Sequence, residues 1–462
     1  MDRKGCPGCR QLRRRVAELE AELRELKAQL GRNASNSSLP PSQNPPQAPP
    51  PVRKEPTGRA PGGQAGHTAH LRERLPPERV KETQHFVPDI CEHCQEDLSL
   101  APGPDDPEPR WHQVVELPAT PVEVTEYQAH GRTCPNCGHL NWAKIPQAIR
   151  DHVCGPRLTA TIALLSGAMH LSKRKIEETV ETVLGAPLAL GTISNLEQEM
   201  SAALAPAHAE AQQAVQEAAA KNVDETGWKQ AGQRCWLWGA ATAVVACFVI
   251  APTRGALGLA ALLGTKIKGI ISSDRWSVYG QLKLGLRQLC WAHLKRDFQK
   301  LLERGGTSRD VGEMGLDAVD LVFELWHAFR GGGLSRAQLQ RQIAPVRQIL
   351  REWLELGCAC RDAKTAAFCT NLLALEPALW TFVRKEGVEP TNNHMERLLR
   401  SGVLWRKNAF GCHSEAGCRF VERILTVVQT LRLQKRPVLD FLYQAMLNHR
   451  GALPAPSLLA GE

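Results

Sequence analysis

Two aspartates stand where the sequence predicts metal chemistry. Asp224 follows Val223 in the first strand expected from the apolar pattern, and Asp274 closes the fourth. Ligands of α/β sheets gather at the carboxyl ends of strands, and two carboxylates that face one point repel each other. A divalent cation relieves that repulsion, and Mg²⁺ prefers oxygen ligands of this kind. We therefore expect a divalent-metal site at Asp224 and Asp274.

Local geometry decides the role of two further carboxylates. Successive residues of a strand point to opposite faces of a sheet, so only one of Asp224 and Glu225 can share the site, and we choose Asp224. Glu396 could point at the metal from the first turn of a helix. It could equally belong to a helix cap with Asn393 as the N-cap, an arrangement that needs no catalysis.

Two Cys-x-x-Cys pairs predict one structural zinc ion. Cys91 and Cys94 form the first pair, and Cys134 and Cys137 form the second. Each pair can present two thiolates to a tetrahedral ion, and four cysteines complete its shell. The alternative is two chance pairs of reduced thiols, because the N-terminus lacks the apolar core of a secretory signal and we expect a cytosolic protein.

Basic side chains are concentrated in the segment 397–436, which holds nine lysines and arginines against two glutamates. Such a segment can neutralise DNA phosphates, although a solvated helix face is the alternative, and the net charge of +9 suits a polyanionic partner. His293 and Arg296, one helical turn apart, could also reach a scissile phosphate. The residues of this segment that we expect to contact DNA are Arg397, Arg400, Arg406 and Lys407.

The elements of 221–302 must bring these side chains together. The expected strands are 222–229, 234–241, 243–250, 266–273 and 286–290, and the expected helices are 257–263 and 292–302. Three neighbouring strands, a helix, a strand and a strand that enters a helix are the element order of a ribonuclease H-like mixed sheet. Helical segments interrupt this core over 303–388, it resumes over 389–436, and a C-terminal element follows over 437–462.

Smaller domains are expected in front of this core. Apolar residues from Leu12 to Leu30 alternate in steps of four and three, which predicts a dimerising coiled coil within 1–31, or else a lone amphipathic helix. Segments then follow with the character of a disordered linker (32–66), a small zinc-binding domain (67–150) and a helical region (151–220). The helical region is either a helix-turn-helix that reads DNA or a connecting bundle. We predict a multidomain α/β protein without a membrane span.

Four short motifs resemble those of transposases of the insertion sequence 66 family, which belong to the DDE group. They read Val-Asp-Glu-Thr-Gly at 223–227, Ser-Asp-Arg at 273–275, Cys-Trp-Ala-His at 290–293 and Asn-Asn-His-Met-Glu-Arg at 392–397. Their order matches the family, and the resemblance covers nearly the whole chain. The tail that begins at Pro437 departs from it.

The resemblance implies a ribonuclease H-like core in which Asp224, Asp274 and Glu396 hold two Mg²⁺ or Mn²⁺ ions. It implies metal-dependent cleavage and transfer of DNA strands, acting on double-stranded DNA with terminal inverted repeats and on a target DNA. Helper proteins and a homodimer or higher oligomer built on the coiled coil are further expectations. Two alternatives stay open, namely a non-catalytic zinc-containing DNA-binding protein and a structure-selective nuclease on the same fold.

Overall fold

A computed structural model gives the fold of the chain. It describes residues 14–16, 18–20, 23, 74–91, 93–98, 101, 107, 112–115, 122–137 and 139–459. Contacts divide the chain into a smaller unit, Pro49–Val124, and a larger unit formed by Met1–Ala48 and Thr125–Glu462. None of the described helices combines the length and the hydrophobicity that a bilayer span requires.

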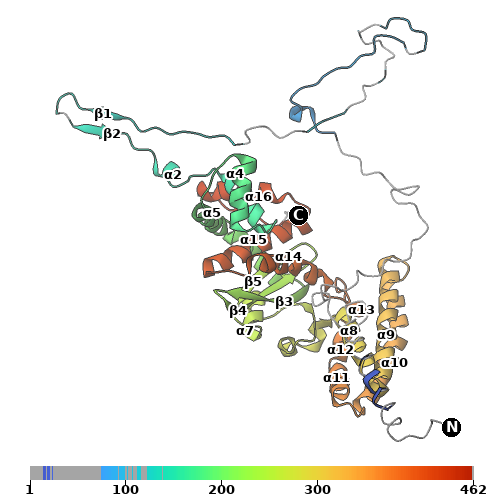
Figure 1. Cartoon of the computed structure of the whole chain (residues 1–462). Coiled ribbons are helices and arrows are strands. Elements are labelled where there is room, and N and C mark those ends of the chain that lie inside the picture. The colour runs from blue at the N-terminus through green and yellow to red at the C-terminus, as the bar shows by residue number, and fades with distance from the viewer. Residues whose placement is uncertain are drawn as a thin grey trace, which may run out of the picture. The chain divides into compact units, whose positions relative to one another are not determined.

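A mixed five-stranded sheet lies in the larger unit (Figure 1). Its strands are β3 (Ala220–Gln230), β4 (Gln233–Ala241), β5 (Ala246–Ala251), β6 (Ile270–Ser273) and β7 (Arg287–Leu289), in the spatial order β5-β4-β3-β6-β7. The first three pair antiparallel, while β6 runs parallel to β3 and β7 runs parallel to β6. The five expected strands are confirmed. Strand β6 begins at Ile270 rather than Lys266 because Gly269 adopts φ +72°, which interrupts extended backbone.

Two helices cover opposite faces of this sheet. The helices of this part of the chain are α7 (Ala256–Leu263), α8 (Trp291–Leu302), α14 (Asn393–Ala409) and α15 (Glu415–Leu433). A Cβ at Gly239 of β4 would collide with Met395 of α14, whereas a Cβ at Gly258 of α7 would collide with the indole of Trp238. Because Trp238 and Gly239 are successive residues of one strand, α7 and α14 lie on opposite faces.

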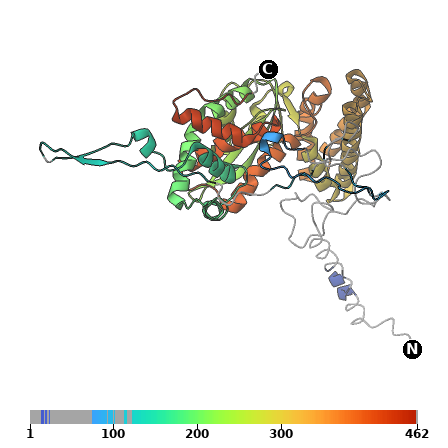
Figure 2. The same ribbon diagram turned by 90° about the horizontal axis from the view of Figure 1, so that it is seen from above.

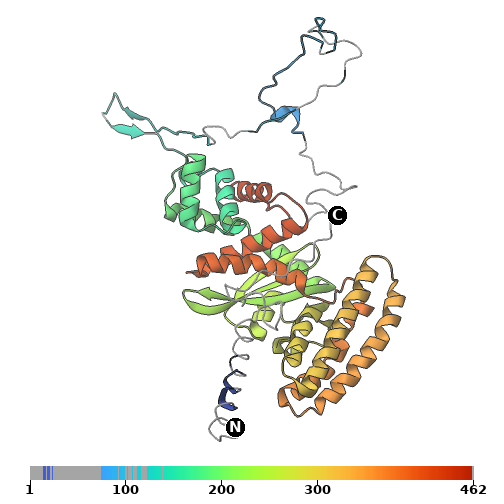
Figure 3. The ribbon, with the colours of Figure 1, turned by 45° about the vertical axis from the view of Figure 1, so that its right-hand side comes forward.

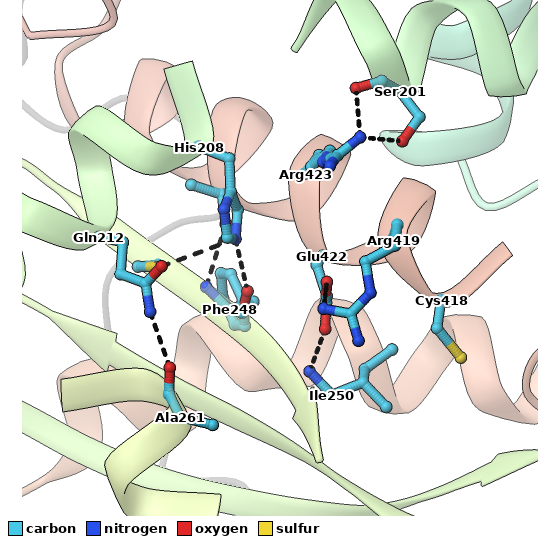
Figure 4. A network of polar contacts seen from close by, with 12 residues as sticks. Ser201, His208, Gln212, Phe248, Ile250, Ala261, Cys418, Arg419, Glu422 and Arg423 are labelled. Atoms are coloured by element: carbon cyan, nitrogen blue, oxygen red, sulfur yellow. Dashed lines mark hydrogen bonds and ion pairs between the residues drawn. The ribbon is translucent and has the colours of Figure 1, made fainter. Parts of the chain in front are cut away.

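Helix α15 protects the outer edge of β5. Three of its side chains, one helical turn apart, accept hydrogen bonds from backbone N–H groups of that strand. These bonds join Glu422 to Ile250 (2.5 Å), Thr426 to Phe248 (3.0 Å) and Thr430 to Ala246 (3.1 Å). The imidazole of His208 lies 2.9 Å from the Phe248 carbonyl, so this carbonyl group of the strand also has a hydrogen-bond partner (Figure 4). An edge strand whose N–H groups are bonded in this way offers no template for a further strand.

A helical block separates β7 from α14 in the sequence. It contains α9 (Gly306–Arg330), α10 (Arg336–Cys358), α11 (Ala363–Ala374), α12 (Glu376–Leu379) and α13 (Thr381–Arg384). These helices and α8 lie side by side (Figures 2 and 3). Their buried apolar side chains form one cluster that also includes Ile270 and Leu289 of the sheet. The block is anchored to the sheet by polar contacts, such as the Thr381 hydroxyl, which donates to the Arg287 carbonyl at 2.6 Å. The expected helical content of 303–388 is confirmed.

The region before the sheet is also helical. It contains α3 (Pro156–Gly167), α4 (Lys173–Leu184), α5 (Leu190–Ala203) and α6 (Ala205–Glu217). Helix α5 begins at Leu190, and its N-cap Ala189 makes no side-chain capping bond. The C-terminal element is helix α16 (Val438–Arg450), which packs on α3 and α5.

The remaining described parts are small. In the smaller unit, a short 3₁₀ turn spans Pro77–Arg79 and one bridge joins Ile90 to Asp97. In the larger unit, the hairpin β1 (Gly131–Thr133) and β2 (Leu140–Trp142) is followed by α2 (Gln147–Arg150). The described residues of 14–23 are helical, whereas the predicted linker 32–66 lies outside the described residues.

Candidate active site

The pleat of β3 sends its two neighbouring acids to different faces of the sheet. Asp224 pairs with Gly239 on β4, and Glu225 pairs with Trp238. Cross-strand partners share a face, so Asp224 faces α14 and Glu225 faces α7. The alternation expected from the sequence therefore separates the two carboxylates.

The parallel register of β3 and β6 brings Asp224 next to Asp274. Asn222 pairs with Ser272. Asp224 lies two residues further along β3, and Asp274 lies two residues after Ser272 in the chain. The Asp274 Oδ1 accepts a hydrogen bond of 2.8 Å from the backbone N–H of Trp276, which fixes this carboxylate just beyond the end of β6.

Asp224 occupies a site with excess negative charge. Burial raises the pKa of its carboxyl group well above the usual value. The negative charges of Glu225, Asp274 and Glu396 raise that pKa further, while the backbone N–H of Glu225 opposes the shift. Carboxylates that destabilise one another in this way are stabilised as anions by a cation placed among them.

Glu225 is already neutralised on the opposite face. Its Oε1 accepts from Arg254 Nε at 2.7 Å, and its Oε2 accepts from the Tyr279 hydroxyl at 2.9 Å. Burial raises the pKa of Glu225, and the hydrogen bond from Arg254 opposes that shift. Because both of its oxygens are engaged, Glu225 is a poorer metal ligand than Asp224.

The beginning of α14 is attached directly to the sheet. The N-cap of the helix is Asn392, whose side chain makes no capping bond. Its Nδ2 donates instead to the Val223 carbonyl at 2.9 Å, and its Oδ1 accepts from Asn222 Nδ2 at 3.0 Å. The capping alternative, with Asn393 as the N-cap, is therefore wrong. These two hydrogen bonds, here called the Asn392 clamp, attach the start of α14 to the sheet and so set the position of Glu396 one turn later.

Helix α8 presents three side chains to Glu396. His293 Nδ1 lies 3.4 Å from Glu396 Oε1, and Arg296 Nη2 lies 3.9 Å from Oε2. His293 Nδ1 and Glu396 Oε1 are buried and have no hydrogen-bond partner. The Cys290 thiol, the His293 imidazole and the Glu396 carboxylate each offer a ligand atom within 4.8 Å of the others, so this group could hold a metal ion.

The protonation of His293 suits coordination, whereas that of Cys290 opposes it, because a thiol binds a metal as the thiolate. Burial lowers the pKa of His293, and the charge of Arg296 lowers it further, while Glu396 opposes the shift. A neutral imidazole is the form that binds metals. Burial raises the pKa of the Cys290 thiol to about 11, and this thiol accepts a hydrogen bond from the Asn392 N–H at 3.1 Å.

The donor atoms divide into two chemical sets that share Glu396. Asp224, Asp274 and Glu396 provide the oxygens that hard cations such as Mg²⁺ prefer. Cys290 and His293 add the softer donors typical of zinc sites. His293 Nδ1 and Glu396 Oε1 make no hydrogen bond and, with the Cys290 thiol, could hold a metal ion.

The basic residues expected to bind DNA lie in different settings. Arg397, Arg400 and Lys407 are exposed on α14. Arg406 is half-buried and donates to the Thr226 hydroxyl at 3.3 Å and to the Gly227 carbonyl, so it also ties α14 to β3. The other arginines of the segment bond within the fold, namely Arg419 to Glu422, Arg423 to Ser201, Arg432 to Ala168 and Arg436 to Leu458. Part of the charge imbalance therefore serves the fold.

Each cysteine pair forms a tight backbone turn. The Cys91 N–H donates to the Glu96 carbonyl and the Cys134 N–H donates to the His139 carbonyl, at 2.9 and 2.8 Å. Backbone N–H groups of the Cys94 turn lower the pKa of Cys91, and those of the Cys137 turn lower the pKa of Cys134. The first pair belongs to the smaller unit and the second to the larger one. Each turn favours the thiolate form that zinc binds.

Several residues of this site were missed from the sequence. Arg254 and Tyr279, which neutralise Glu225, lie in no motif and are brought there by the fold alone. Arg287 of β7 is 1% exposed, and its charge lies close to Asp274. Cys290 and Asn392 stand in the quoted motifs, and the spacing of Cys290 to His293 was the signal that could have assigned Cys290.

Comparison with known families agrees with these motifs. A model described as the transposase IS66 family matches residues 152–419, which is more than half of the chain. The chain belongs to the IS66 transposase family. The matched range contains the sheet, the three carboxylates and the helical block. A second model, for a family of unknown function, matches residues 8–73.

Two curated relatives come from Sinorhizobium fredii (strain NBRC 101917 / NGR234). The uncharacterised protein y4qI is 28% identical over 253 residues, covering 49% of this chain and 46% of the relative. The uncharacterised protein y4hP is 26% identical over 339 residues, covering 65% of this chain and 60% of the relative. The chain thus spans about half to three fifths of the length of these relatives. Membership of the IS66 family implies a function related to transposition.

Proposed function

We propose that this IS66-family chain is a transposase that cleaves and transfers DNA strands of an insertion sequence in a metal-dependent reaction. The observation that carries the proposal is the register that sets Asp224 beside Asp274, together with the charges of Asp274 and Glu396, which add to burial in raising the pKa of Asp224 and so favour a bound cation. Burying carboxylates that repel one another is costly, and such groups are often found where they are used in binding or catalysis.

The sheet supports a ribonuclease H-like core. Its order β5-β4-β3-β6-β7 combines an antiparallel meander with two parallel strands. Asp224 comes from the middle strand of this sheet, Asp274 from the end of the adjacent parallel strand and Glu396 from the helix packed across β3 and β4. Such a core gathers ligands from distant parts of the chain at one point, as phosphoryl transfer requires.

The chain's own residues would hold and orient the reactants. Asp224, Asp274 and Glu396 would hold two Mg²⁺ or Mn²⁺ ions, which, when bound, supply Lewis-acid activation of a hydroxyl and charge stabilisation at the leaving oxygen. His293 and Arg296 orient the Glu396 carboxylate from α8. The exposed Arg397, Arg400 and Lys407 of α14, with Arg406 and with Arg296 of α8, would contact DNA phosphates.

Strand cleavage by the full chain tests this proposal. The substrate is DNA that carries the inverted repeats flanking the gene, incubated with Mg²⁺ and a target plasmid. We expect nicked and joined products from the wild type and none from Asp224→Asn, Asp274→Asn or Glu396→Gln, whereas Glu386→Gln, an exposed acid of the helical block, keeps activity. Cleavage without joining would indicate a nuclease. Unchanged activity in any of the three variants would remove that residue from the site.

The N-terminal parts are proposed to assemble the active complex. We infer that Cys91, Cys94, Cys134 and Cys137 bind one zinc ion, supported by the lowered pKa values of Cys91 and Cys134. Metal analysis of the purified chain, before and after Cys134→Ser, tests this. The coiled-coil proposal is supported by Val16, Leu19 and Leu23, which are 52, 47 and 51% exposed on helical residues. Sedimentation of the wild type and of Leu19→Glu should separate a dimer from a monomer.

A further inference from the structure

We propose that the pocket beside Asp274 binds one unstacked nucleotide of the DNA strand, with the indole of Trp276 as its stacking surface. The inference rests on the proposed function, because it assigns this pocket to the same DNA. It differs from the metal site in chemistry and in residues, and it is tested without catalysis.

The pocket opens between the start of α7 and the 3₁₀ segment Ser277–Gln281. Its volume is about 380 Å³, which lies within the range of roughly 300–1,000 Å³ typical of small-molecule sites. Its lining combines one aromatic ring, one guanidinium and short polar side chains, contributed mainly by Thr253, Arg254, Trp276, Ser277 and Gln281. Such a lining suits a flat heteroaromatic ring with a polar edge.

Trp276 is held in place while much of its surface stays open. The residue is 39% exposed, although its backbone N–H donates to Asp274 Oδ1 at 2.8 Å. The guanidinium of Arg254 lies over its ring at 4.0 Å from the centroid. Arg254 thus covers part of the indole while 39% of the residue stays open to solvent, as expected of a stacking platform.

Arg254 makes this platform rigid. Its Nε is bonded to Glu225 at 2.7 Å, and its guanidinium also lies 5.0 Å from the centroid of Trp236. Arg234 lies over Trp236 at 4.8 Å, so cations and indoles alternate along this side of the sheet. A ring held by such a stack loses little conformational entropy when a base binds.

The position of the pocket identifies the ligand. Trp276 follows Asp274 by two residues, and its backbone N–H bonds to that carboxylate, so a base stacked on Trp276 would belong to a strand that passes the end of β6 beside Asp274, on the α7 side of the sheet. Enzymes that act on a duplex often take one base out of the stack, and an aromatic surface compensates for the lost stacking. Because the charge of Arg254 is shared with Glu225, we assign the recognition to stacking rather than to charge.

Binding of two single strands by the full chain tests the proposal. The probes are a short thymidine oligonucleotide and an oligomer of the same length made of abasic residues, compared by fluorescence anisotropy in the presence of EDTA. The wild type should bind the thymidine strand more tightly. Trp276→Ala should weaken thymidine binding about 5- to 150-fold, since stacking contributes ~1–3 kcal/mol per base, and leave abasic binding unchanged.

The controls separate this pocket from folding and from catalysis. Trp276→Phe should retain most of the preference for bases, and Leu257→Ala, which shortens a side chain that is 78% exposed beside the pocket, should retain all of it. Unchanged thymidine binding by Trp276→Ala, or equal losses on both strands, would overturn the assignment. Because no metal is present, this result is independent of whether Asp274→Asn abolishes strand cleavage.

Discussion

Replacing Asn392 should damage both the fold and the chemistry, because this residue joins α14 to the sheet. Asn392 is fully buried, and its side chain bonds to Val223 and Asn222. Asn392→Ala leaves the Val223 carbonyl and the Asn222 amide without these partners. Each orphaned buried group costs about 1–3 kcal/mol, and Asn222 is half-buried, so we expect a loss of about 2–4 kcal/mol.

This loss of stability can be measured as a decrease in the melting temperature. For a domain of this size, each kcal/mol corresponds to about 2–4 °C, so Asn392→Ala should melt roughly 4–16 °C below the wild type. Glu396 lies one turn after the clamp, and displacing a reacting group by about 1 Å can cost about 100-fold in rate. We therefore expect Mg²⁺-dependent cleavage to fall about 100-fold at a temperature where the variant remains folded.

The matched control is Asn408→Ala on the same helix. Asn408 is exposed and donates one long hydrogen bond, of 3.4 Å, to the His170 carbonyl, so its loss should change stability by less than about 0.5 kcal/mol. A wild-type melting temperature for Asn392→Ala would refute the clamp. A lowered melting temperature with unchanged cleavage would refute its role in positioning Glu396.

Three further predictions concern the polar contacts around the sheet. Burial raises the pKa of Glu422 to about 7 in the fold, above its unfolded value, so the folded state binds more protons and stability should fall as pH rises through about 5–7. Glu422→Gln should reduce the dependence of stability on pH, as measured by melting curves recorded across this pH range. An unchanged dependence would show that another group causes it. Arg254→Ala leaves the buried Glu225 unpaired and should cost about 3 kcal/mol in thermal unfolding, whereas no loss would show that Tyr279 suffices. Thr430→Val keeps the shape but leaves the β5 edge without its hydroxyl, which should cost about 1–3 kcal/mol, and a neutral result would show that water replaces it.

The sheet could be predicted from the sequence because its signals are local. Apolar runs and turn residues marked each strand of 221–290, and alternation along β3 separated Asp224 from Glu225. The start of α14 could not be predicted in the same way. Asn392 and Asn393 are both good caps, and the choice between them depends on the distant Val223 carbonyl, which the folded sheet brings within 2.9 Å.

The site could be predicted only for residues that carry a motif. Asp274 is recognisable at the end of its strand, whereas Arg254 pairs with Glu225 across 29 positions of the chain without any periodic signal. The excess positive charge of the 397–436 segment could be seen in the sequence. Which of its basic residues bond within the fold and which stay exposed could not. Burial decides that Arg423 bonds to Ser201 while Arg400 stays exposed, and burial depends on tertiary packing.

Binding of Mn²⁺ by the full chain tests the central claim most directly. Electron paramagnetic resonance of free Mn²⁺ during a titration gives the number of ions bound and their affinity. We predict binding by the wild type that Asp224→Asn, Asp274→Asn and Glu396→Gln each weaken at least about 10-fold, because each variant removes one anionic ligand. Wild-type affinity in all three variants would contradict the assignment of these carboxylates to one metal site.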